Sequence, residues 1–207
     1  RSADRTEVRG PERLAGLDVS MRDCSDTAPT LGAIARIGGE DYPDKLIVAS
    51  QPRSPIAEAY RVLRTNIRFS SVDRPARALM VTSPNPVEGK SITLANLAVV
   101  MAQAGLSVVA VDTDLRRPVL HKIFSLSNSH GISDAILQPN PGLAEHMQDT
   151  GVENLRVLPS GPLPPNPAEL LGSERMGKAI EELKGQADVV LFDSPPVLAV
   201  TDAAVLS

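Results

Sequence analysis

Apolar runs of strand length alternate along the chain with segments of helical periodicity. The runs lie at 79–82, 107–112, 155–158 and 189–193, and the second of them is rich in valine. Helical patterns accompany them over 54–70, from residue 91 onward and over 167–184. Because short buried strands that alternate with helices form layered folds, this pattern predicts an α/β protein with a mainly parallel sheet.

The segment 54–70 has the features of an amphipathic helix. Ser54 and Pro55 supply a cap and a first-turn residue. Its apolar stripe consists of Ile56, Tyr60, Leu63, Ile67 and Phe69. We expect this stripe to face the core of the protein.

Residues 91–111 contain no charged side chain, and the segment is long enough to imitate a membrane span. Polar or small residues interrupt it at Asn96, Gln103, Gly105 and Ser107. We therefore interpret it as a buried helix that stops at Gly105 and is followed by a buried strand.

Composition narrows the classes of function and suggests a division of the chain. The 207 residues carry a net charge of −4 and only 2% aromatic residues, so no nucleic-acid partner is expected. The single cysteine, Cys24, cannot form an internal disulfide, which fits a reducing compartment. Residues 1–53 mix charge, glycine and proline without lasting periodicity. We expect an N-terminal linker or tail over 1–53, with a short extended piece at 31–37, and one folded domain over 54–207.

The segment 83–91, Ser-Pro-Asn-Pro-Val-Glu-Gly-Lys-Ser, joins a predicted strand to a predicted helix. Gly-Lys-Ser at such a junction is the closing half of a phosphate-binding loop, where free backbone N–H groups attract anions. Pro84 stands where this motif usually has its first glycine. The alternative is an ordinary strand–helix turn with a surface lysine. The candidate nucleotide-binding residues are Asn85, Pro86, Val87, Glu88, Gly89, Lys90, Ser91 and Ile92.

Acidic residues follow two of the predicted strands. Asp112 and Asp114 end the valine-rich run, and Asp193 ends the run at 189–193. Ligands bind at the carboxyl ends of the strands in open α/β sheets, and Mg²⁺ prefers oxygen ligands. One carboxylate could hold the ion through water while another assists a nucleophile as a base. The alternative is that these residues cap strand ends, turns or helices.

These motifs together resemble the nucleotide site of the bacterial tyrosine kinases. The matching stretches are the loop at 83–91, Asp-x-Asp-x-Arg-Arg-Pro at 112–118 and Asp-Ser-Pro-Pro at 193–196. Two further stretches, Glu-x-x-Arg-x-x-Arg at 58–64 and the loop and helix start at 158–171, are also similar to the family. The resemblance covers about 54–207 and implies a P-loop NTPase-like, three-layer fold. In the family a further strand–helix portion follows, so the fold is expected to be C-terminally incomplete in this sequence.

The resemblance implies an ATP- and Mg²⁺-dependent protein-tyrosine (auto)kinase that regulates capsular or exopolysaccharide polymerisation and export. It assigns catalytic roles to Lys90, Asp112 and Asp114, with Asp112 nearest to the base, and metal binding to Ser91, Asp112 and Asp193. It assigns Glu58, Arg61 and Arg64 to the packing of subunits into a ring. The implied partners are a transmembrane chain-length determinant and the tyrosine-rich tail of a neighbouring subunit. The implied location is cytoplasmic, at the inner face of the membrane.

Some positions depart from the family pattern. Val87 stands where the family usually has glycine. If that position needs a positive φ, a β-branched residue should add about 1–2 kcal/mol of strain and weaken ATP binding. Tyr42 is a candidate acceptor in a polar loop, whereas Tyr60 is expected in the core. The histidines at 121, 130 and 146 show no ligand spacing and are interpreted as surface or structural residues.

Two alternative functions stay open at this point. One is a partition-type P-loop ATPase, although such proteins carry a second lysine near the start of the loop, where this chain has Asn85. The other is a degenerate nucleotide-binding scaffold of a membrane polysaccharide complex, which Val87 favours.

Overall fold

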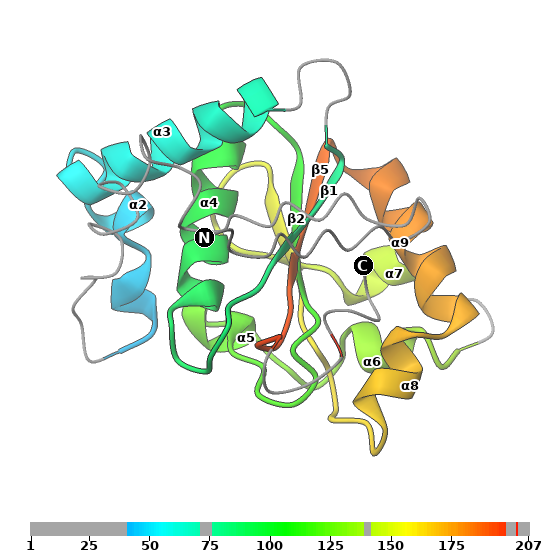
Figure 1. Ribbon diagram of the computed structural model, residues 1–207. Coiled ribbons are helices and arrows are strands. Elements are labelled where there is room, and N and C mark those ends of the chain that lie inside the picture. The colour runs from blue at the N-terminus through cyan, green and yellow to red at the C-terminus, as the bar shows by residue number, and fades with distance from the viewer. Residues whose placement is uncertain (1–40, 71–75, 139–141, 198–201, 203–207) are drawn as a thin grey trace, which may run out of the picture.

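A five-stranded sheet in the order β1-β5-β2-β4-β3 forms the centre of the molecule (Figure 1). The computed structural model describes residues 41–70, 76–138, 142–197 and 202. The strands are β1 (Ala78–Val81), β2 (Val108–Asp112), β3 (Gln148–Asp149), β4 (Leu155–Leu158) and β5 (Val189–Asp193). The neighbouring strands β1, β5, β2 and β4 pair in parallel. Among the described strands, only β3 pairs antiparallel, with β4. The mainly parallel α/β fold is therefore confirmed.

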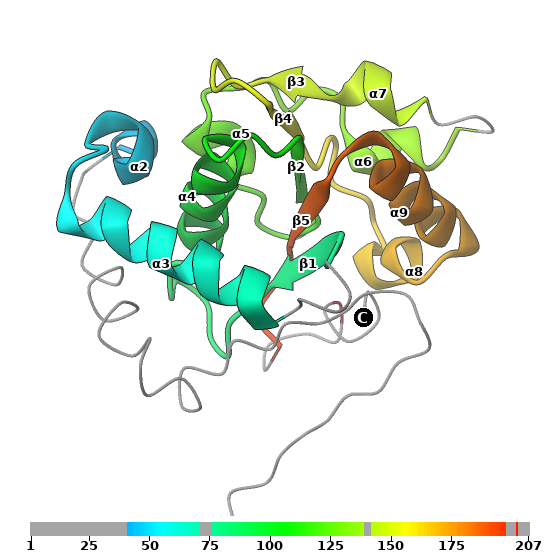
Figure 2. The same cartoon turned by 90° about the horizontal axis from the view of Figure 1, so that it is seen from above.

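Helices cover both faces of the sheet, so the fold has three layers (Figure 2). One face carries α2 (Ile47–Ser50), α3 (Pro55–Ser70), α4 (Lys90–Ala102) and α5 (Leu120–Ile123). The other carries α6 (Ile132–Ala135), α7 (Leu143–His146), α8 (Pro167–Leu171) and α9 (Glu174–Gln186). Because side chains alternate along each strand, Leu191 belongs to the first core cluster and Phe192 to the second.

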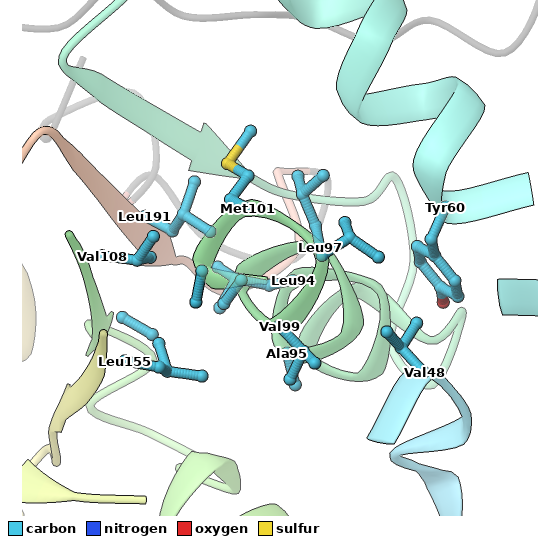
Figure 3. Packing of buried hydrophobic residues seen from close by; sticks show 14 of the residues in the cluster. Val48, Tyr60, Leu94, Ala95, Leu97, Val99, Met101, Val108, Leu155 and Leu191 are labelled. Carbon is cyan, nitrogen blue, oxygen red and sulfur yellow. The ribbon is translucent and has the colours of Figure 1, made fainter. Parts of the chain in front are cut away.

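The uncharged segment 91–111 forms the buried helix α4 and the buried strand β2, as predicted. Gly105 lies between them with φ +87°, a conformation that glycine adopts without a Cβ clash. Figure 3 shows α4 between the sheet and the outer helices, with Leu94 and Leu97 packed among Val48, Tyr60 and Leu191. No helix in the described part of the chain is both long enough and apolar enough to span a membrane.

The helix predicted over 54–70 is α3, and its cap is the predicted one. The Ser54 hydroxyl oxygen accepts a hydrogen bond from the Ala57 N–H at 3.1 Å. Tyr60, Leu63 and Ile67 are buried as expected, but Phe69 is 73% exposed, so its place in the core stripe was wrong. Successive residues turn by about 100°, which puts Phe69 on nearly the opposite face from Ile67.

The helical pattern predicted over 167–184 is divided between two helices. α8 ends at Leu171, and Ser173 caps α9 by accepting the Met176 N–H at 3.2 Å. The short helices α5, α6 and α7 and the two-residue strand β3 were not predicted.

The segment before α3 is structured and packs against the P-loop helix α4. It forms a 3₁₀ turn, η1 (Pro43–Lys45), followed by α2. Fully buried Asn96 of α4 donates to the Lys45 carbonyl at 2.8 Å and accepts the Val48 N–H at 3.0 Å. Cys24 and the extended piece predicted at 31–37 lie outside the described residues.

Candidate functional site

The predicted site residues come together where the strands β1, β2 and β5 end (lower edge in Figure 1). β1 leads into the loop 82–89, and α4 begins at Lys90. Asp112 and Asp193 are register partners at the ends of β2 and β5, which places their carboxylates on adjacent strands. The Thr113 hydroxyl ties these strand ends together by donating to the Asp193 carbonyl at 2.7 Å.

Lys90 is held by acidic residues from two different strands. Its Nζ lies 2.8 Å from Asp114 Oδ2 and 3.4 Å from Asp193 Oδ1, and it also donates to the Ser91 hydroxyl at 3.2 Å. Burial by itself would lower the pKa of Lys90, but the charges of Asp193 and Asp114 outweigh burial and raise it. The amine therefore stays a full positive charge at the carboxyl edge of the sheet.

Asp112 has one structural oxygen and one free oxygen. Its Oδ2 accepts the N–H groups of Val119 at 3.0 Å and Leu120 at 2.9 Å, at the start of α5. Its Oδ1 is buried and has no hydrogen-bond partner among the described residues. Burial, reinforced by the neighbouring charge of Asp193, raises the pKa of Asp112 well above its usual range. The helix-cap interpretation and the chemical one thus apply to different oxygens of the same side chain.

Asp193 is arranged in the same way. Its Oδ1 faces Lys90, and its buried Oδ2 has no hydrogen-bond partner within the described part of the chain. Burial raises the pKa of Asp193 to about 6, although the Lys90 charge opposes the rise. The edge therefore presents two unpaired carboxylate oxygens beside a fixed ammonium group.

These free oxygens fit a hydrated Mg²⁺ ion. Mg²⁺ uses few protein carboxylates and fills its remaining positions with water and phosphate oxygens. Ser91, Asp112 and Asp193 offer a hydroxyl and two carboxylates, all buried. No three His, Cys, Asp or Glu side chains among the described residues are grouped so that they could hold a metal ion by themselves.

The loop before α4 contains the strained position that the sequence suggested. Val87 has φ 65° and is 98% exposed, and Gly89 has φ 89°. The Glu88 carboxylate accepts the backbone N–H of Asn85 at 3.2 Å and its side-chain amide at 2.9 Å. Val87 therefore has the positive φ on which the expected strain depends.

Asp114 leads to a residue that sequence reasoning missed. Its Oδ1 accepts the N–H groups of Arg116 at 3.3 Å and Arg117 at 3.0 Å. The Arg116 guanidinium forms two hydrogen bonds with the carboxylate of Asp202, which is fully buried. No spacing could reveal this pair, because its members are 86 residues apart in the sequence.

The residues expected to pack subunits lie on α3. Arg61 and Glu58 form the predicted pair, with Nη1 and Oε2 2.9 Å apart, and Arg61 also donates to the Pro52 carbonyl. Arg64 donates to the Val100 carbonyl near the end of α4, at 3.1 Å. Their part in oligomerisation stays a prediction.

The two tyrosines behave as the sequence indicated. Tyr60 is fully buried, and burial raises its pKa, so its place in the core is confirmed. Tyr42 is 37% exposed, and the Lys45 ammonium lies 5.1 Å from the centre of its ring.

Comparisons with known proteins agree with this geometry. Residues 79–199 match the CobQ/CobB/MinD/ParA nucleotide binding domain. Tyrosine-protein kinase YwqD of Bacillus subtilis is 44% identical over 174 residues, which are 84% of this chain and 73% of that protein. The kinase domain of Escherichia coli tyrosine kinase ETK superposes with a TM-score of 0.74 at 37% identity, covering 78% of this chain and 63% of that one. Tyrosine-protein kinase wzc of Salmonella typhimurium is 38% identical over 97% of this chain but only 27% of its own length.

Proposed function

Because the chain belongs to the bacterial tyrosine-protein kinases of the CobQ/CobB/MinD/ParA nucleotide-binding family, we propose that it transfers the γ-phosphate of ATP to tyrosine hydroxyl groups. In this role it regulates the polymerisation and export of capsular or exopolysaccharide. The observation that carries the proposal is the convergence of Lys90 with Asp114 and Asp193 beside the start of α4. The partition-type ATPases are related to this chain only through the wider nucleotide-binding family.

The loop residues 85–92 would hold the nucleotide. The backbone N–H groups of residues 89–92 would bind phosphate, because the first turn of α4 leaves them without helical partners. Lys90, held by Asp114 and Asp193, would contact the transferring phosphate and stabilise its charge. Ser91, Asp112 and Asp193 would hold Mg²⁺, which supplies charge neutralisation at the phosphate oxygens.

Asp112 is the residue we assign to the acceptor proton. The tyrosine oxygen forms a bond to the γ-phosphorus while the bond from phosphorus to the bridging oxygen breaks, and ADP leaves with that electron pair. The proton of the tyrosine hydroxyl passes to Asp112. Its buried oxygen, which has no hydrogen-bond partner among the described residues, supports this role, because a base needs a lone pair that is free to take the proton.

Further proposals concern the bounds of the kinase unit and the proteins that it contacts. We assign the kinase unit to residues 43–207 instead of the predicted 54–207, because η1 and α2 pack against α4, and we assign a linker to the residues before them. A transmembrane chain-length determinant would keep the unit at the inner face of the membrane. Glu58, Arg61 and Arg64 on α3 would contact a neighbouring copy, and the acceptor would be a tyrosine-rich tail.

The test is transfer from labelled ATP with Mg²⁺ to a tyrosine-bearing peptide. We expect phosphotyrosine with the unmodified chain and none with Lys90→Ala. Lys184→Ala, which removes an ammonium paired with Glu181 on the distant helix α9, is the matched control and should stay active. Release of phosphate without phosphotyrosine would identify an ATPase, and neither product would identify a scaffold.

A further inference from the structure

The carboxylate of Asp114 is fixed at both of its oxygens. One oxygen faces the Lys90 ammonium at 2.8 Å, and the other accepts the backbone N–H groups of Arg116 and Arg117. The place of this carboxylate therefore depends on the backbone at 116–117. Whatever holds that backbone therefore helps to position the Lys90 ammonium, which also contacts Asp193 and the Ser91 hydroxyl.

The Arg116 side chain anchors this backbone to a different part of the fold. Its Nε lies 2.8 Å from Asp202 Oδ2, and its Nη2 lies 3.1 Å from Asp202 Oδ1. This two-bond geometry fixes direction as well as distance, which a single ammonium contact cannot do. Asp202 has no exposed surface, and a buried carboxylate that loses its ionic partner destabilises the fold strongly. Loss of this contact should therefore cost more free energy than loss of an exposed ion pair.

The geometry makes Arg116 a positioning residue and not a catalytic one. Its side chain is 43% exposed and extends to Asp202, while its N–H group faces Asp114. Arg117 donates a similar N–H group to Asp114, but its side chain takes part in no ion pair among the described residues. The two neighbouring arginines thus share the backbone contact and differ in the anchor.

We propose that the Arg116–Asp202 ion pair positions Asp114, and through it Lys90, for phosphate transfer. The proposal rests on the proposed kinase function. Since the pair touches neither the loop 85–89 nor Ser91, its loss should slow the transfer step more than it weakens ATP binding. Displacement of aligned groups by about 1 Å can lower a rate by about a hundredfold.

The experiment measures kcat and KM for ATP in Arg116→Gln with the tyrosine-bearing peptide. We expect kcat to fall by about tenfold or more and KM to change by less than about twofold. Arg117→Gln should lose less activity than Arg116→Gln. Arg175→Gln is the matched control and should match the unmodified chain, because it removes a guanidinium on α9 that donates to the Leu137 carbonyl in the turn after α6.

A second measurement needs neither nucleotide nor activity. Backbone amide exchange at 116–117 should be faster in Arg116→Gln than in Arg175→Gln, because the N–H groups that bond Asp114 are then less well held. If Arg116→Gln does not fold, the double variant Arg116→Gln/Asp202→Asn replaces it, because it leaves no unpaired buried charge.

Several results would overturn the proposal. These are an unchanged kcat, a raised KM with an unchanged kcat, equal losses in Arg116→Gln and Arg117→Gln, or unchanged amide exchange. The unmodified chain is assayed first for transfer to peptide and to water. Transfer to water alone refutes the kinase function. The Arg116–Asp202 ion pair is then tested by the same comparison of kcat and KM, measured for ATP hydrolysis. Transfer to neither overturns both proposals.

Discussion

At the scale of single residues, the phosphate loop holds a β-branched side chain in a backbone conformation that suits glycine. Val87 has φ 65° and packs against nothing, since it is 98% exposed. No contact made by its side chain offsets the cost of that conformation, which is about 1–2 kcal/mol for a residue with a Cβ.

Replacing Val87 by glycine should stabilise the fold. Val87 already has φ 65° in the folded chain, so relief of the strain should raise the free energy of unfolding by about 1–2 kcal/mol, measured by urea unfolding. Val87→Ala, which keeps the Cβ but removes the branching, should give a smaller gain. Equal free energies of unfolding in all three chains would show that this conformation costs nothing at position 87.

The buried carboxylates predict how stability depends on pH without metal. Burial raises the pKa of Asp193 to about 6 from an unfolded value near 3.8, so between these values the folded chain binds more protons than the unfolded one. The folded state therefore loses stability as pH rises from about 4 to about 6, and Asp112 acts in the same direction.

Thermal unfolding in EDTA measures this effect. The contribution of Asp193 appears as a smaller drop in melting temperature between pH 4 and pH 6 in Asp193→Asn than in the unmodified chain. The same drop in both chains would assign the pH dependence to other groups.

At the scale of elements, Asn96 connects two helices that lie far apart in the sequence. Its side chain makes three hydrogen bonds, to the Lys45 and Ile92 carbonyls and from the Val48 N–H, with no exposed surface. The amide thus replaces backbone partners that α2 and η1 lack.

Asn96→Ala should lower the free energy of unfolding by about 2–4 kcal/mol, because the buried Val48 N–H and the partly buried Lys45 carbonyl would lose their partners. Urea unfolding measures the change. Gln103→Ala removes an amide from the exposed end of the same helix and should change stability by less than about 0.5 kcal/mol. A similarly small effect at Asn96 would mean that water replaces its bonds.

Elements of this fold differ in how far the sequence could predict them. β2 and β5 follow from unbroken apolar runs that end in aspartate, because a strand buried on both faces carries few polar residues. The core of α4 follows from its uncharged, mostly apolar sequence. The phosphate loop and the acidic strand ends were predicted because each is a short run of consecutive residues whose types indicate the chemistry. β3 was missed because a strand of two residues shows no hydrophobic period. The break at Gly172 was missed because the helical pattern continues across the cap of α9. Asp202 was missed because only the folded chain brings it to Arg116.

At the scale of the whole molecule, the two helical layers share one set of strands. Leu191 packs among the helices α2 to α5, and its neighbour Phe192 packs among α6 to α9. Neither layer can lose its packing without exposing the opposite face of the same strand, so we expect one cooperative unfolding transition.

Leu191→Ala and Phe192→Ala test this cooperativity from opposite sides. Each should lower the free energy of unfolding by about 3–5 kcal/mol and shift the urea midpoint without changing the slope. Circular dichroism and aromatic fluorescence should give coincident curves. Two separate transitions in either variant would contradict a shared core.

The contacts of Lys90 also bear on which form of the nucleotide can enter. One ammonium faces the carboxylates of Asp112, Asp114 and Asp193, so the entrance offers a triphosphate no surplus of positive charge. A nucleotide that arrives without its cation would be repelled, whereas the magnesium complex brings the compensating charge with it. The carboxylates that pair with Lys90 would thus make nucleotide binding depend on Mg²⁺.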